Sequence, residues 1–215
     1  MHSLEIFNRA LFIWINADDE TPLIFVKIAQ IFAVYLIYLI PILLVSLFLW
    51  GSRRIRQAAL LALIVTVVAL LINQCIGFLY FHPRPFMNND GFTWLSHAPE
   101  TSFPSDHMTV FMAVAVSLIF DGVSRAGLIT LLFGIVVGWS RVFLGVHYPF
   151  DMLGSIGVAA ISYLIVHPFW TQMAPATLQL YDRLYHGFIG KRIVHEYGKD
   201  INEQNVRKKQ SDPSP

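Results

Sequence analysis

The chain has 215 residues, of which 55% are hydrophobic and 13% are charged, and its formal net charge is +1. Soluble domains carry about 25% charged residues, so this composition indicates a membrane protein rather than a soluble one. A net charge so close to zero does not indicate nucleic acid or another polyanion as a partner. The single cysteine, Cys75, excludes an intrachain disulfide.

The first predicted element is an amphipathic helix over residues 3–17. Its apolar positions are interrupted by Glu5, Asn8, Arg9 and Asn16, so we expect it to lie in the membrane interface rather than to cross the bilayer. We expect no cleavable signal peptide, because Glu5 precedes a short apolar stretch and no small-residue cleavage site follows it.

Five apolar runs then reach or approach the roughly 20 residues that cross a bilayer. The predicted spans are residues 23–50, 57–81, 105–120, 126–144 and 150–170. The third is short, and Pro41 is expected to kink the first. The predicted fold class is all-α, a polytopic transmembrane helix bundle with an interfacial helix at each end.

The second interfacial helix is predicted from alternating apolar and basic residues at 178–192. Residues 198–215 are polar and are expected to form a disordered cytoplasmic tail. With no internal repeat, residues 1–197 are predicted to form a single membrane-embedded domain.

Basic residues are unevenly divided between the two sides of this predicted bundle. Most of the 15 Lys and Arg residues fall in the loops 51–56 and 121–125 and in the C-terminal region. The positive-inside rule therefore predicts a cytoplasmic C-terminus and places the loops 82–104 and 145–149 outside.

Three polar clusters fall on that outer face. They are His82-Pro83-Arg84-Pro85, then Pro104-Ser105-Asp106-His107, and finally Ser140-Arg141 with His147-Tyr148-Pro149-Phe150-Asp151. Ionisable groups at membrane depth are costly and indicate a functional site.

The second cluster and the two arginines favour binding of a phosphate group. Arg84 and Arg141 carry planar guanidinium groups suited to phosphate oxygens, although an arginine at a helix end commonly contacts only lipid headgroups. Ser105 is expected to be an N-cap, and a helix N-terminus attracts anions; capping alone is the alternative. His107 would lie in the first helical turn, beside the anion.

His147 and Asp151 lie four residues apart, on either side of a predicted helix start at Pro149. A carboxylate that bonds one imidazole nitrogen leaves the other free to attack. Helix capping is the alternative explanation of this pair.

These clusters resemble the signature of the type 2 phosphatidic acid phosphatase (PAP2) superfamily, K-x6-RP, PSGH and SR-x5-H-x3-D. The third part is complete from Ser140, a candidate modulator, to Asp151. The second part is represented by residues 104–107. The first part retains Arg84-Pro85 but has Gly77 at the lysine position. Within the superfamily, the sequence most resembles bacterial undecaprenyl-diphosphatases of the bacitracin-resistance type.

The resemblance implies a role for each matching residue. His147 would be the nucleophile that forms a phosphohistidine, Asp151 would orient it, and His107 would be the general acid. The implied phosphate ligands are Arg84, Ser105 and Arg141. No metal and no cofactor are implied.

Two departures from the signature add candidate modulators. Gly77 removes a cation, and Gln74 or Asn73, about one turn earlier, could supply polar contacts instead; a purely structural role is the alternative. Asp106 replaces a glycine, and we expect it either to cap the helix or to favour the protonated form of His107.

The implied reaction is hydrolysis of undecaprenyl diphosphate at the extracytoplasmic (periplasmic) face of the bacterial plasma (inner) membrane, with the headgroup between spans three, four and five. This reaction would recycle the lipid carrier of peptidoglycan synthesis and confer bacitracin resistance. The expected partners are this lipid and other membrane lipids; the oligomeric state is left open.

Three alternatives remain at this stage. A PAP2 phosphatase could act on phosphatidylglycerophosphate or another lipid phosphate, and a phosphotransferase could pass the phosphate to a second lipid. A non-catalytic transporter or scaffold could use the arginines only to bind headgroups.

Overall fold

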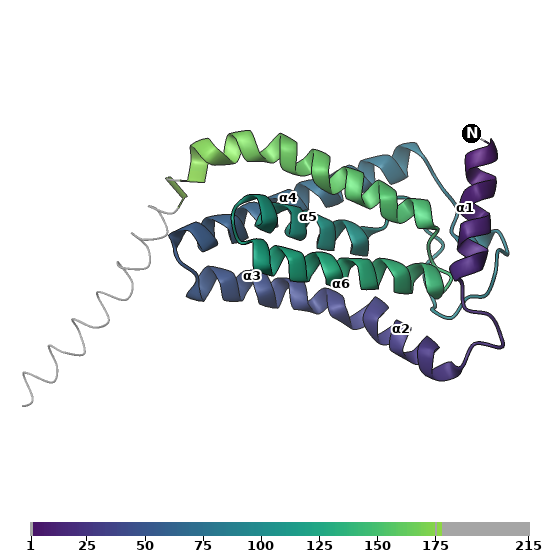
Figure 1. Cartoon of the computed structure of the whole chain (residues 1–215). Coiled ribbons are helices and arrows are strands. Elements are labelled where there is room, and N and C mark those ends of the chain that lie inside the picture. Colours follow the sequence, from purple (N-terminus) through teal and green to yellow (C-terminus); the bar gives the residue numbers. More distant parts are fainter. Residues whose placement is uncertain (1, 175, 178–215) are drawn as a thin grey trace, which may run out of the picture. The chain divides into compact units, whose positions relative to one another are not determined.

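The structure is a computed structural model that describes residues 2–174, 176 and 177. Its helices are α1 (His2–Ile15), α2 (Leu23–Tyr35), α3 (Leu39–Trp50), α4 (Arg53–Leu79), α5 (Asp106–Phe120) and α6 (Ser124–Phe143), with short 3-10 helices η1 (Leu36–Tyr38) and η2 (Pro85–Met87). A final helix covers Pro149–Ala174 and is drawn in light green in Figure 1. The described residues contain no strand, so the all-α prediction is confirmed.

Four of these segments are long and apolar enough to cross a membrane, namely Leu23–Trp50, Arg53–Leu79, Ser124–Phe143 and Pro149–Ala174. The third predicted span corresponds to α5, which has only 15 residues. At 1.5 Å per residue it is about 22 Å long, less than the hydrocarbon core of roughly 30 Å. The structure therefore has four full-length candidate spans and one short apolar helix where five spans were predicted.

The short helix α5 is the centre of the bundle. It packs against both α4 and α6, and nine of its residues are buried, including Met108, Phe111, Met112 and Val114. Because its neighbours cover it, α5 can carry polar residues at its N-terminal end without exposing them to lipid.

The first long segment is interrupted by η1, which separates α2 from α3. Pro41 lies just after this interruption and cannot donate a backbone hydrogen bond, and its ring crowds the carbonyl of Ile37. The position of η1 therefore agrees with the kink expected from Pro41.

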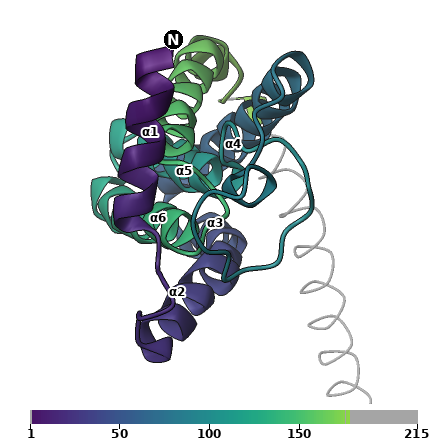
Figure 2. The same cartoon turned by 90° about the vertical axis from the view of Figure 1, so that its right-hand side faces the viewer.

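Helix α1 lies across one end of the bundle, nearly perpendicular to the long helices (Figures 1 and 2). Leu4, Phe7 and Trp14 are exposed while Asn8 and Phe12 are buried, as expected for an amphipathic helix. The side-chain oxygen of Asn8 accepts a hydrogen bond from the backbone N–H of Phe150 at 3.0 Å. Helix α1 thereby satisfies a donor at the start of the final helix.

The loop between η2 and α5 is anchored at this same end. The backbone N–H of Trp94 donates to the carbonyl of Leu144 at 3.0 Å, and its indole N–H donates to the carbonyl of Ala17 at 2.9 Å. Gly145 has φ +80°, and a Cβ there would lie 2.1 Å from the carbonyl oxygen of Phe92. Glycine is therefore required where the loop crosses the end of α6.

Residues up to Trp170 form one compact unit, and Thr171 begins a second. The predicted C-terminal interfacial helix at 178–192, the domain boundary at 197 and the polar tail all lie outside the described residues. The site considered below belongs entirely to the first unit.

Candidate active site

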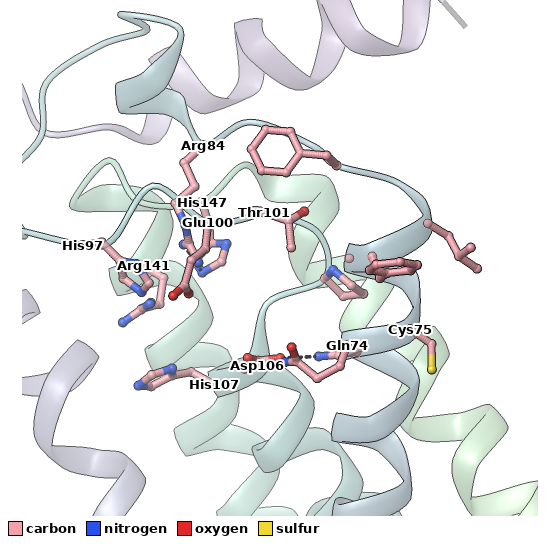
Figure 3. A pocket seen from close by; sticks show the side chains of 16 residues that line it. Gln74, Cys75, Arg84, His97, Glu100, Thr101, Asp106, His107, Arg141 and His147 are labelled. Carbon is pink, nitrogen blue, oxygen red and sulfur yellow. Dashed lines mark hydrogen bonds between the residues drawn. The ribbon is translucent and has the colours of Figure 1, made fainter.

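The three polar clusters meet at the end of the bundle that α1 covers. They border a pocket of about 900 Å3 whose lining includes Arg84, Asp106, His107, Arg141 and His147, as Figure 3 shows. Ser105 and Asp151 are fully buried behind this lining. The fold therefore brings the predicted site residues together from α5, α6, the final helix and two loops.

His147 lies between Arg84 and Asp151. Its Nδ1 is 3.2 Å from Oδ2 of Asp151, and its Nε2 is 3.0 Å from Nη1 of Arg84. A guanidinium group can only donate, so Nε2 accepts and the proton of the neutral ring resides on Nδ1, facing the carboxylate. This tautomer leaves the lone pair of Nε2 on the Arg84 side, in the pocket.

Asp151 both caps a helix and orients the imidazole. Its Oδ2 accepts a hydrogen bond from the backbone N–H of Tyr148 at 2.8 Å, in the first turn of the final helix, while it faces Nδ1 of His147. Asp151 thus makes both the capping hydrogen bond and the contact with His147 that the sequence offered as alternatives.

The environment of His147 favours its neutral form. Its side chain is buried, and burial is the main reason why its pKa lies well below the usual value, with Arg141 and Arg84 lowering it further. An imidazole that stays unprotonated keeps its lone pair available for attack.

Ser102 is a site residue that the sequence did not indicate. Its hydroxyl donates to Oδ2 of Asp151 at 2.5 Å and lies 3.3 Å from Nδ1 of His147. Its backbone N–H donates to the carbonyl of His82 at 2.6 Å. A serine in a loop 45 residues before its partner carries no local pattern that could have identified it.

His82 belongs to the first polar cluster but had no predicted role. Its Nδ1 lies 3.8 Å from Oδ1 of Asp151, and its Nε2 lies 3.6 Å from Oε2 of Glu5 on α1. Asp151 is therefore bordered by two histidines, and the interfacial helix reaches the buried carboxylate through one of them.

Several buried donors around the pocket have no hydrogen-bond partner among the described residues. They are Nε of Arg84, Nε of Arg141 and the hydroxyl of Ser105. Ser105 occupies the N-cap position of α5, as predicted, but its side chain makes no capping hydrogen bond. Buried donors are normally satisfied, and unpaired ones beside a helix N-terminus suit an anion.

Asp106 faces α4. Its Oδ1 accepts a hydrogen bond from Nδ2 of Asn73 at 2.8 Å, and Asn73 also donates to the hydroxyl of Thr109 at 2.9 Å. Asn73 is buried and joins α4 to α5, and both Asn73 and Gln74 line the pocket. Of the two candidate replacements for the lysine, only Gln74 is exposed.

The other departure, Gly77, is also explained by local packing, and Ser140 has a hydrogen-bond partner within its own helix. A Cβ at Gly77 would lie 2.6 Å from Cγ2 of Thr101, so any side chain there requires Thr101 to move. The hydroxyl of Ser140 donates to the carbonyl of Val137 within α6 at 2.8 Å, and Ser140 is not part of the pocket lining.

The far wall of the pocket differs from the expectation. Gln74, Cys75, Phe78 and Leu79, at the end of α4, line it, and no described residue of the final helix does so. The pocket therefore extends along α4, whereas the headgroup was expected between spans three, four and five.

Metal ligands were not expected. Within the part of the chain that the structure describes, no group of three or more His, Cys, Asp or Glu side chains is placed to hold a metal ion. The positive charge that lines the pocket comes from Arg84 and Arg141.

The sequence matches the PAP2 superfamily over residues 57–175, more than half of the chain. This chain belongs to the PAP2 superfamily. YbjG of Escherichia coli (strain K12) is 37% identical over 181 residues, which cover 84% of this chain and 90% of YbjG. BcrC of Bacillus subtilis (strain 168), named an undecaprenyl-diphosphatase, is 35% identical over 73% of this chain and 80% of its own length.

A solved structure agrees with the fold of this PAP2 member. LpxE of Aquifex aeolicus superimposes with a TM-score of 0.62 over 74% of this chain and 93% of LpxE, at 21% identity. At this level of identity the similarity concerns the fold alone.

Proposed function

We propose that this PAP2 chain is an integral-membrane phosphatase that hydrolyses undecaprenyl diphosphate to undecaprenyl phosphate and inorganic phosphate. The observation that carries the proposal is the arrangement of His147. Its Nε2 lone pair lies in a pocket with two buried arginines, and its Nδ1 faces Asp151. The name of the relative BcrC supports the choice of substrate.

The first chemical step is attack of Nε2 on the terminal phosphorus. A phosphorus–nitrogen bond forms, and the bond from that phosphorus to the bridging oxygen breaks. The lipid monophosphate leaves with the electron pair, and His107 donates a proton to the departing oxygen. Asp151 stabilises the positive charge that develops on the phosphorylated ring.

The second step returns the enzyme to its starting state. Water attacks the phosphohistidine, His107 takes a proton from that water, and the phosphorus–nitrogen bond breaks to release inorganic phosphate. Arg84 and Arg141 neutralise the charge on the phosphoryl oxygens in both steps, which is the main requirement of phosphoryl transfer, and the Ser105 hydroxyl donates a hydrogen bond to the same oxygens.

The prenyl chain is accommodated beside the end of α4. Phe78 and Leu79 line the pocket, and they are 91% and 82% exposed, so an apolar chain can leave the polar end of the pocket along them into the lipid. By the positive-inside rule, this end of the bundle faces the extracytoplasmic side, and the C-terminus is cytoplasmic.

The test is phosphate release by the purified full-length chain in detergent, from a panel of lipid mono- and diphosphates. We expect the prenyl diphosphate to be preferred, and His147→Ala to lose at least about 10³-fold in kcat. We also expect radioactive phosphate from a terminally labelled substrate to label wild-type protein and His107→Gln but not His147→Ala.

The same assay separates the alternatives. Phosphate passed to an added acceptor lipid in preference to water would indicate a phosphotransferase, and preference for phosphatidylglycerophosphate would indicate a different phosphatase. Binding without phosphate release would indicate a scaffold. Reversible loss of turnover with a chelator would contradict the mechanism above, in which the arginines neutralise the phosphate.

A further inference from the structure

His97 is an ionisable pocket residue that the mechanism above does not use. It stands in the loop before α5 and lines the pocket, and its ring lies 6.4 Å from the ring of His147, centroid to centroid. Figure 3 shows His97 at the same end of the pocket as Arg141 and His147, with Cys75 at the other end. Ser102 and Asp151, by contrast, contact the Nδ1 side of His147.

A backbone contact determines how the His97 ring can bind an anion. Its Nδ1 lies 3.2 Å from the carbonyl oxygen of Ala98, and a carbonyl only accepts, so Nδ1 carries the proton. Nε2 of the neutral ring therefore has no hydrogen to donate. Only the doubly protonated ring can donate from Nε2 to a phosphate oxygen, and it then also contributes a positive charge.

The charges around His97 oppose this protonation when the pocket holds no substrate. Burial is the main cause that lowers the pKa of His97, and Arg84 and Arg141 lower it further, while Glu100 raises it. The other titratable groups among the described lining residues are Cys75, Asp106, His107 and His147. A bound anion reverses the sign of the local field and so favours uptake of a proton by His97.

A lipid diphosphate brings more negative charge than the two arginines neutralise, because one phosphate monoester already carries about −1.5 to −2 at neutral pH. The end of α4 that lines the pocket adds no cation, since its described lining residues are Asn73, Gln74, Cys75, Gly77, Phe78 and Leu79. The terminal phosphate must contact Nε2 of His147, and in-line displacement places the leaving phosphate away from that nitrogen. Among the described histidines and arginines that line the pocket, His97 is the one to which the mechanism assigns no role.

We propose that His97 is a substrate-binding residue that holds the phosphate remaining on the lipid, as an imidazolium, and so selects lipid diphosphates over lipid monophosphates. This inference rests on the proposed function. It predicts that diphosphate binding takes up a proton and weakens as the pH rises. A permanent cation at position 97 would remove that pH dependence.

The test compares wild type, His97→Gln and His97→Lys, with His167→Gln as the control. His167 lies on the final helix, and its Nε2 is 3.9 Å from Oδ1 of Asp121. It is not part of the pocket lining. We expect His97→Gln to raise KM for the prenyl diphosphate, and Ki for inorganic pyrophosphate, by about 10-fold or more. Its kcat, and its KM for the matching monophosphate, should change far less. His97→Lys should restore KM and make it independent of pH near neutrality.

Calorimetry with inorganic pyrophosphate, in buffers of different ionisation enthalpy, tests the wild-type protein without any substitution. Proton uptake on binding is expected; its absence would overturn the proposal. Equal losses with mono- and diphosphate in His97→Gln, or an unchanged pH dependence of KM, would overturn it too. If the wild-type protein released no phosphate from lipid diphosphates, the proposed function itself would fail. If wild-type turnover were normal and His97→Gln behaved like His167→Gln, only the role of His97 would be refuted.

Discussion

Arg84 donates a hydrogen bond from Nη1 to Nε2 of His147 at 3.0 Å, and the same nitrogen donates to the carbonyl of Val146 at 3.0 Å. The guanidinium group therefore occupies the space in front of Nε2, in the plane of the ring. The phosphorus atom that Nε2 attacks must come to lie in this same space. Substrate binding has to exchange the contact with Nε2 for contacts with phosphate oxygens, while the bond to Val146 can keep the arginine in place.

This relationship predicts a large cost for Arg84→Lys even though the charge is kept. Lysine lacks the planar fork that can hold a carbonyl and two phosphate oxygens together, so we expect kcat/KM to fall by about 10²-fold. Steady-state phosphate release in detergent measures the effect. Arg125→Lys, at an exposed position on α6, is the matched control, and a wild-type value for Arg84→Lys would contradict this reading of the contact.

Ser102 is expected to position Asp151 and His147. Ser102→Ala removes the hydroxyl that bonds Asp151 and frees the carboxylate and ring to reorient, so kcat should fall by about 10- to 100-fold with little change in KM. The rate of phosphohistidine formation in a single turnover is the measurement. Ser162→Ala is a suitable control because Ser162 is also buried but bonds only the carbonyl of Val158 in its own helix; equal effects of the two substitutions would refute the role.

The pH dependence of phosphohistidine formation follows from the lowered pKa of His147. A histidine with a lowered pKa stays neutral at pH values where an ordinary one is protonated, so the acid limb should lie well below about pH 6.5. Single-turnover labelling in a series of acidic buffers measures this limb. The fold of the protein is checked after return to neutral pH. A limb centred at the ordinary histidine value would show that the ring is not desolvated.

Gly77 and Thr101 are expected to be energetically coupled. Gly77→Ala places a methyl group 2.6 Å from Cγ2 of Thr101, and the shift also disturbs the hydrogen bond from the backbone N–H of His82 to the Thr101 hydroxyl. We expect a loss of about 1–3 kcal/mol in stability, seen as a lower Tm in detergent. The double variant Gly77→Ala with Thr101→Ser removes Cγ2, keeps the hydroxyl and should recover most of the loss. Additive effects in this double-mutant cycle would exclude the contact.

The sequence alone determined the membrane-spanning helices, the family and the order of the three polar clusters. The length of an apolar run can be counted in the local sequence, and the thickness of the bilayer sets the length that a span needs. The pairing of His147 with Asp151 was equally local, since four residues at the start of a helix bring two side chains to one place. Among the helices, only their exact ends and the position of the 3-10 break η1 before Pro41 needed the structure.

Tertiary structure decided the remainder of the site. Ser102, His82 and His97 reach Asp151 or the pocket because their loop is anchored to α1, α2 and the end of α6, through contacts such as those of Trp94. Such partners are separated by tens of residues, and no helical period or short motif records them. Whether Ser105 caps its helix or leaves its hydroxyl free, and whether Gly77 has room for a side chain, likewise depended on neighbours that only packing brings together.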